Sequence, residues 1–141
     1  MVGSTDGVLD GGTLTQSTDI FASSLTAAGV ISWTVQLRSL QEDWGNGIGV
    51  DAAGNIYLAG QAGGMFEGFS THGSSDIALI RIDSSGSVLA IQLVGTTTFD
   101  NAQALMVTPK GVYYTGSTNG LLGPTSFGGT DAIIAFAPLL F

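Results

Sequence analysis

The segment Asp51-Ala-Ala-Gly-Asn-Ile-Tyr-Leu-Ala-Gly60 specifies the fold most clearly. It places a short polar turn that contains glycine directly before a run of β-branched, aromatic and aliphatic residues. Glycine in such a turn can adopt a positive φ, and a run of this kind favours a β-strand. A related segment, one residue shorter, extends from Thr108 to Gly116. The two copies predict a turn–strand unit that is repeated along the chain.

Other residues recur at a spacing close to that of this unit. Gly-Ser-Thr-Asp-Gly at 3–7 aligns with Gly-Gln-Ala-Gly-Gly at 60–64 and with Gly-Ser-Thr-Asn-Gly at 116–120. Similar spacings relate Asp19, Asp76 and Asp131, then Gly29 and Gly86, then Asp43 and Asp100, and finally Leu9, Phe66 and Leu122. Several sets at one spacing indicate a structural repeat of 56–57 residues rather than low complexity.

The repeat is built from short strands bounded by Gly, Asp, Asn and Ser. The pattern predicts strands at 19–25, 30–37, 46–51, 55–60, 76–83, 88–94, 103–107, 111–116 and 131–137. No segment has ten or more residues with a convincing helical period. Four short antiparallel strands in a unit of this length are typical of a β-propeller blade. We therefore predict an all-β fold with about two and a half such repeats.

Three stretches resemble a known repeat family. In the middle copy, Asp51–Gly60 is followed by a loop and then by Gly73-Ser-Ser-Asp-Ile-Ala-Leu-Ile-Arg-Ile-Asp-Ser-Ser-Gly86. The third copy comprises Lys110–Gly116 and Phe127–Ala135, and the first contains Asp19–Leu25 and Gly29–Trp33. These stretches resemble the SBBP-type β-propeller repeat family. The resemblance implies a propeller architecture and no particular chemistry, because the recurring residues are turn glycines and apolar strand residues.

The strand pattern divides the chain into one complete and two incomplete blades. We expect an incomplete blade at 1–45, a complete blade at 46–102 and a second incomplete blade at 103–141. Propellers close with about four to eight blades, so this chain is too short to close alone. An open end exposes a strand edge and an apolar face. We therefore predict a homo-oligomer or docking to another subunit, and the alternative is that the chain is a piece of a longer propeller.

The candidate interface residues are large and apolar and lie near the two incomplete blades. They are Trp33, Ile134, Phe136, Leu139, Leu140 and Phe141. The run Ala135–Phe141 favours burial against a partner, and packing of this tail on the chain's own core remains the alternative. Its length is well below the twenty apolar residues of a spanning helix, so we predict no membrane span.

Long loops at 38–45, 61–75, 95–102 and 117–130 are expected on one face of the blades, where binding sites commonly lie. The ligand-binding candidates on this face are Asp43, Trp44, Asn46, Phe69, Phe99, Asp100 and Asn101. This mixture of polar and aromatic residues suits a carbohydrate or a peptide. The alternative is structural, with aromatic rings filling gaps between blades and the repeated aspartates accepting hydrogen bonds from turn N–H groups.

Composition and motifs exclude several functions. The formal net charge is −8, and Arg38, Arg81 and Lys110 are the whole cationic supply, so nucleic acid is not a predicted partner. The chain has no cysteine and a single histidine, His72. Asp6 and Asp10 resemble a calcium loop only faintly. We find no nucleophile elbow and no phosphate-binding motif. We predict no metal, no cofactor and no catalytic residue.

These observations favour a non-enzymatic structural or interaction module that completes a β-propeller or a larger extracellular assembly. The alternative function is a carbohydrate-binding, lectin-like module that uses the long-loop face, and a hydrolase is a third hypothesis. The acidic, lysine-poor composition favours a secreted or cell-surface location, although the N-terminus lacks the basic and apolar segments of a signal peptide.

Overall fold

The computed structural model describes residues 1–139, and within that range every regular element is a β-strand. The strands are β1 (Val2–Thr5), β2 (Asp19–Leu25), β3 (Ile31–Leu37), β4 (Trp44–Val50), β5 (Ile56–Phe66), β6 (Phe69–Ile82), β7 (Val88–Val94), β8 (Asp100–Thr108), β9 (Gly111–Thr118) and β10 (Asp131–Pro138). All pairings between these strands are antiparallel. The expectation of an all-β fold is thus confirmed.

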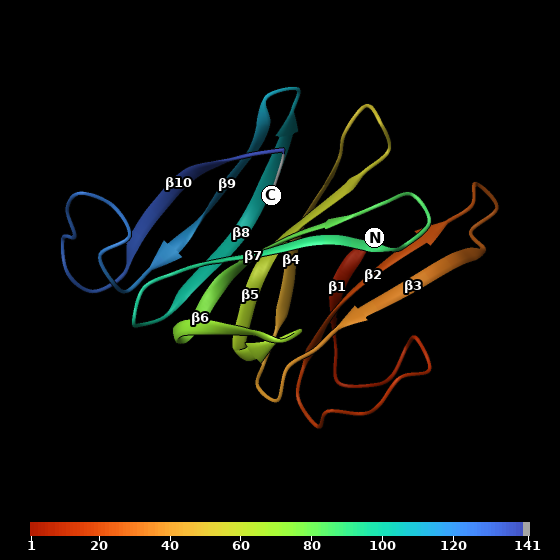
Figure 1. The fold of residues 1–141 in the computed structure, drawn as a ribbon, viewed down its shortest axis with the longest axis horizontal. Helices are drawn as coiled ribbons and strands as arrows, with labels where there is room; N and C mark the ends of the chain where they lie inside the picture. The colour runs from red at the N-terminus through yellow and green to blue at the C-terminus, as the bar shows by residue number, and fades with distance from the viewer. Residues whose placement is uncertain (140–141) are drawn as a thin grey trace.

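The strands form three sheets in chain order (Figure 1). The first sheet is β1-β2-β3, the second is β4-β5-β6-β7, and the third has the order β10-β9-β8. The second sheet lies between the other two, and the three sheets do not close into a ring within the described chain. The first and third sheets each have one strand fewer than the second.

The short turns between strands are those expected from glycine and aspartate. Gly54 has a φ of 86° and Gly86 a φ of 93°, values that a side chain would strain. The Asp51 carboxylate accepts hydrogen bonds from the backbone N–H groups of Ala53 and Asn55, each at 2.9 Å. Asp83 accepts equivalent bonds in its own turn. These local bonds hold the strand pairs in register.

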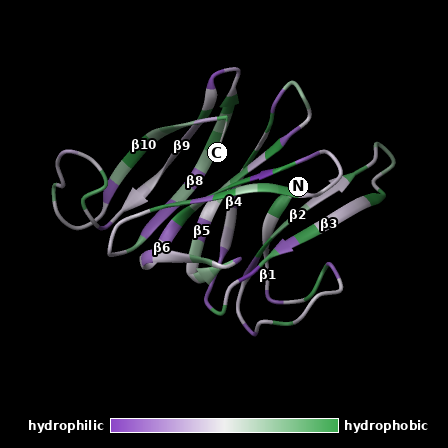
Figure 2. Cartoon of the chain, viewed as in Figure 1, coloured by the Kyte–Doolittle hydropathy of each residue, from purple (hydrophilic) through white to green (hydrophobic). Residues whose placement is uncertain are grey.

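The core consists of two apolar layers, one on each side of the second sheet. Side chains of β6 alternate between them, because successive residues of a strand point to opposite faces. Ala78 and Ile80 pack toward the first sheet, whereas Ile77 and Leu79 pack toward the third. All four are fully buried. Figure 2 shows that much of the strongly hydrophobic colour lies on the strands. Sheet-to-sheet burial is therefore the main stabilising contact.

Two features differ from the sequence-based expectation. Val2–Thr5 forms strand β1, which a four-residue run was too short to predict. The expected loop at 61–75 is mostly a hairpin, in which β5 and β6 continue to a turn at Glu67 and Gly68. Phe66 near its tip is fully buried against the first sheet. That long-range contact stabilises strand structure in a segment rich in glycine.

None of the described residues belongs to a helix long and apolar enough to cross a membrane.

Candidate functional site

Short turns and long loops lie at opposite ends of the strands. Because neighbouring strands are antiparallel, the turns after β2, β4, β6 and β8 share one end, and the connections after β1, β3, β5, β7 and β9 share the other. The second group includes the connections 6–18, 38–43, 95–99 and 119–130. This arrangement places these four longer connections toward one end of the strands (Figure 1).

A repeated aspartate organises these loops. Asp19, Asp100 and Asp131 each open a strand, and Asp76 lies within β6. All four accept a hydrogen bond from the residue four positions earlier. The donors are Thr15 Oγ1 at 3.0 Å, the His72 N–H at 3.1 Å, the Thr96 N–H at 2.6 Å and the Phe127 N–H at 3.1 Å. The carboxylates thus satisfy loop donors that would otherwise be unpaired.

Two of the predicted ligand-binding residues, Asp43 and Asp100, are fully buried. Asp100 accepts hydrogen bonds from the Thr118 hydroxyl and from the Thr96 N–H and hydroxyl. Asp43 Oδ1 accepts a bond of 2.8 Å from the Gly63 N–H, and its Oδ2 has no hydrogen-bond partner among the described residues. Burial raises the pKa of Asp43 to about 7. In this structure neither carboxylate is open to solvent.

The other ligand-binding candidates are more accessible. Trp44, Phe69 and Phe99 have exposed fractions of 41%, 51% and 37%. The Asn46 amide donates to the Ala102 carbonyl oxygen at 2.8 Å and lies 3.4 Å from Asn101 Oδ1.

The accessible candidates come from three places along the chain. Asn46 and Asn101 meet between β4 and β8, and Trp44 begins β4. Phe69 lies at the tip of the β5–β6 hairpin, where it pairs with Phe66, and Phe99 pairs with Ser75.

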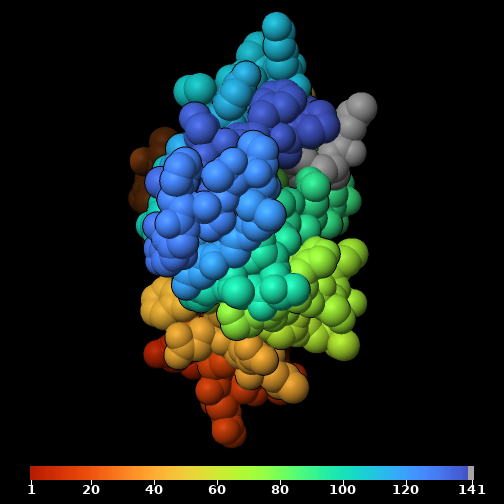
Figure 3. Space-filling model, turned by 90° about the vertical axis from the view of Figure 1, so that its left-hand side faces the viewer, coloured from red at the N-terminus to blue at the C-terminus, as the bar shows by residue number. Residues whose placement is uncertain are grey.

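The third sheet has an open side. β10 pairs with β9 along one edge, and no described strand pairs with its other edge. Ile134 and Phe136 are 76% and 46% exposed, and the Phe136 ring lies 5.0 Å from the ring of Tyr113. A groove of about 420 Å³ runs between β10 and the 119–130 loop. Figure 3 shows this loop and β10 on the same side of the molecule.

The remaining interface candidates have different surroundings. The Trp33 indole N–H donates to the Ser84 carbonyl oxygen at 3.0 Å, so this side chain joins the first sheet to the second within one chain. Leu139 accepts a hydrogen bond of 3.2 Å from Arg81 through its carbonyl oxygen. Leu140 and Phe141 lie outside the described residues.

Comparison with known families places a repeat across the junction of the first two sheets. Residues 33–67 match the SBBP β-propeller repeat. The SBBP segment begins in β3 at Trp33, includes β4 and ends just after β5. No curated protein matches the chain.

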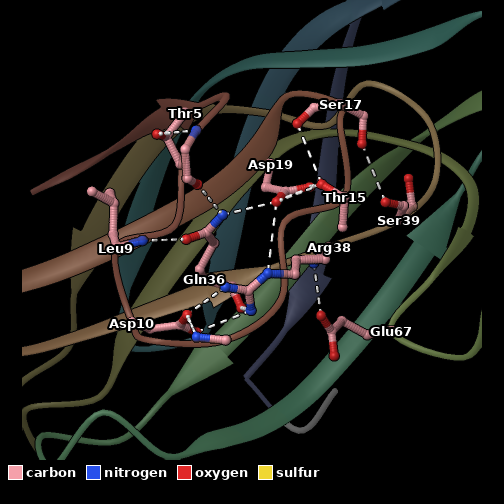
Figure 4. A network of polar contacts seen from close by, with 12 residues as sticks. Thr5, Leu9, Asp10, Thr15, Ser17, Asp19, Gln36, Arg38, Ser39 and Glu67 are labelled. Atoms are coloured by element: carbon pink, nitrogen blue, oxygen red, sulfur yellow. Dashed lines mark hydrogen bonds and ion pairs between the residues drawn. The ribbon is translucent and has the colours of Figure 1, made fainter.

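A polar network ties the SBBP segment to the 6–18 loop (Figure 4). Arg38 forms an ion pair with Asp10 through two hydrogen bonds, and its Nε lies 3.7 Å from Asp19 Oδ2. The hydrogen bonds from Arg38 lower the pKa of Asp10 to about 2. Gln36 donates to Asp19 Oδ2 and to the Gly7 carbonyl oxygen, each at 2.8 Å. The network holds the loop against the edge of the first sheet.

Two polar contacts had no sign in the sequence: the bond from Gln36 to Asp19 and the bond from Trp33 to Ser84. Each bond joins residues at least 17 positions apart, so local patterns carry no sign of it. The sequence gives only a weak indication that Arg38 forms an ion pair, because it is one of three cationic residues in a chain with 11 acidic ones.

Proposed function

We propose that this chain is a non-enzymatic interaction module that forms a segment of a β-propeller and associates through the open side of its third sheet. The partner is another copy of the chain or a different protein that supplies further blades. An extracellular or cell-surface assembly fits the acidic, lysine-poor composition. The SBBP repeat at 33–67 supports the propeller architecture.

One comparison within the chain carries this proposal. Ala22, Leu79 and Ile134 hold the same pairing position in β2, β6 and β10. Ala22 and Leu79 have exposed fractions of 1% and 0%, because each faces the next sheet, whereas Ile134 is 76% exposed. The side of the third sheet that would face a next sheet is therefore uncovered.

The uncovered side is a contiguous apolar surface rather than a single residue. Ile134 and Phe136 come from β10, Tyr113 from β9 and Met106 from β8, and all four are at least 40% exposed. Tyr113 and Phe136 are in ring contact. Scattered apolar residues are ordinary on a protein surface, but a continuous patch beside an unpaired strand favours association.

The test is the association state of the purified chain, measured by size-exclusion chromatography with light scattering. We expect a self-assembled species, or a complex with a propeller-forming partner, that dissociates when Ile134→Asp and Phe136→Asp place charge on the open side. Leu40→Asp is the matched control, because Leu40 is 87% exposed in a loop away from this surface. A wild-type chain that stays monomeric at high concentration, with no partner, contradicts the proposal.

Carbohydrate binding at the long-loop end is the second proposed function. Its support is the exposure of Trp44 beside the Asn46–Asn101 contact, since aromatic rings and amides together suit sugar faces and hydroxyl groups. The burial of Asp43 and Asp100 reduces the polar groups that this end presents to a ligand.

A further inference from the structure

The strand β1 is paired along one edge only. Gly3 of β1, Gly60 of β5 and Gly116 of β9 hold equivalent positions against β2, β6 and β10. The opposite edge of β5 is covered by β4, and that of β9 by β8. No described strand covers the corresponding edge of β1. The second and third sheets therefore show what kind of strand the first sheet lacks.

The covering strands have a specific side-chain requirement where they face each other. A Cβ atom added at Gly49 of β4 would lie 2.6 Å from Val107 Cγ2 and 2.8 Å from Leu105 Cδ1 of β8. A Cβ added at Gly47 would lie 3.0 Å from the Leu105 backbone nitrogen. Glycine at these alternate positions thus makes room for the apolar side chains of the neighbouring strand.

The same apolar pair exists in β4, but no described strand packs against it as β4 packs against β8. Ile48 and Val50 hold in β4 the pairing positions that Leu105 and Val107 hold in β8. Ile48 is 40% exposed and Val50 is 59% exposed. They line a groove of about 330 Å³ between the first and second sheets. The other residues that line it are Met1, Ser23, Ser24, Leu25, Trp33 and Ile56.

We propose that the free edge of β1 binds an extended strand that runs antiparallel to β1 and carries glycine at the alternate positions facing Ile48 and Val50. This strand takes the place relative to β1 that β4 takes relative to β5. Backbone pairing supplies part of the binding, and burial of Ile48 and Val50 against glycine backbone selects the sequence. The inference rests on the proposed function and specifies one of the strands that an added segment supplies.

The probe is a labelled synthetic peptide with the sequence Asp43-Trp-Gly-Asn-Gly-Ile-Gly-Val50, which is that of β4 with one preceding residue. The control peptide carries Gly47→Val and Gly49→Val. Fluorescence anisotropy measures affinity for the full chain, and hydrogen exchange locates the binding site. We expect slower exchange at Val2–Thr5 and at least about tenfold weaker binding of the control peptide, because valine overfills the groove.

A variant with smaller side chains in the groove tests whether groove size causes the preference for glycine. Ile48→Ala with Val50→Ala enlarges the groove in the protein, so we expect it to reduce the preference for the glycine peptide over the valine peptide. Both side chains are partly exposed, which makes the variant compatible with folding. Equal affinity of the two peptides for the wild-type chain, absence of binding, or protection at β10 in place of β1 overturns the inference.

The peptide-binding test of the β1 edge and the association test of the third sheet can fail independently. Association through the third sheet is tested by Ile134→Asp and Phe136→Asp, which leave the β1 edge unchanged. Loss of association in that variant with retained peptide binding supports both ideas. If the wild-type chain associates but binds no peptide, the inference about the edge of β1 is overturned and the third-sheet proposal stands. If the chain binds the peptide but never associates, the third-sheet proposal is overturned and the inference about β1 stands.

Discussion

The Trp33 indole N–H lies 3.0 Å from the Ser84 carbonyl oxygen and joins two consecutive sheets through their outer regions. The ring also lies against Gly86, where an added Cβ atom would come within 2.9 Å of the indole. The residue that begins the SBBP segment thus contacts a turn 51 positions away. Such a contact fixes the first sheet against the second and so positions the groove beside β1.

We expect Trp33→Phe to lower the free energy of unfolding by about 1 kcal/mol, because the ring is largely kept while the hydrogen bond is lost. Urea unfolding followed by circular dichroism measures the change. Trp44→Phe is the control, since Trp44 is 41% exposed, and we expect a change within about 0.5 kcal/mol. An equal effect of the two substitutions would show that the Trp33–Ser84 bond does not stabilise the fold.

The buried Asp43 should make stability fall with rising pH. Its pKa is raised from 3.8 to about 7 by burial, so between these values the folded chain holds a proton that the unfolded chain releases. Stability is therefore lost as the pH rises from about 4 to 7. As the pH rises from 4 to 8, we expect the free energy of unfolding of Asp43→Asn to increase relative to that of wild type by on the order of 2–4 kcal/mol.

Chemical denaturation of wild type and Asp43→Asn across this pH range provides the measurement. The difference between the two profiles isolates Asp43 from the groups that titrate in both proteins. The charge of Asp19, which is retained in the variant, also raises the Asp43 pKa. Parallel profiles would contradict the raised pKa.

The ion pair of Asp10 and Arg38 predicts the opposite pH response. The pKa of Asp10 is lowered to about 2, so its stabilising contribution is present above 3.8 and is lost as the pH falls through about 2. We expect Arg38→Met to return the Asp10 pKa toward 3.8, as measured by NMR titration of the carboxyl carbon. Amide exchange at Leu9 and Gly12 should become faster in the same variant, because Arg38 holds their loop through Asp10. Unchanged exchange would show that the loop is held by Gln36 alone.

The proposed carbohydrate site depends on Trp44. If this end binds glycans, Trp44→Ala should reduce binding on a glycan array by about tenfold or more, consistent with loss of a stacking ring at a binding hot spot. Leu40→Ala serves as the control, because it removes an exposed apolar side chain without changing β4. No binding by the assembled wild-type protein, or equal binding by both variants, would remove the support for a lectin-like function.

Local chemistry was enough to predict the repeat and most of its strands. The turns at Gly54 and Gly86 need a positive φ, and Asp76 accepts a hydrogen bond from the His72 N–H four positions earlier. Both features follow from a few neighbouring residues. The apolar alternation of β6 follows from the period of a strand. The spacing of these residues is therefore enough to predict consecutive antiparallel sheets.

Contacts between distant segments explain what the pattern missed. Val2–Thr5 is a strand because β2 pairs with it, and 61–75 is a hairpin because Phe66 is buried against the first sheet. Asp43 and Trp44 are adjacent in sequence, yet one is buried and the other exposed. Burial depends on which sheet packs over a residue. Sequence thus established the repeating unit, while the packing of three sheets determined which faces and edges remain open.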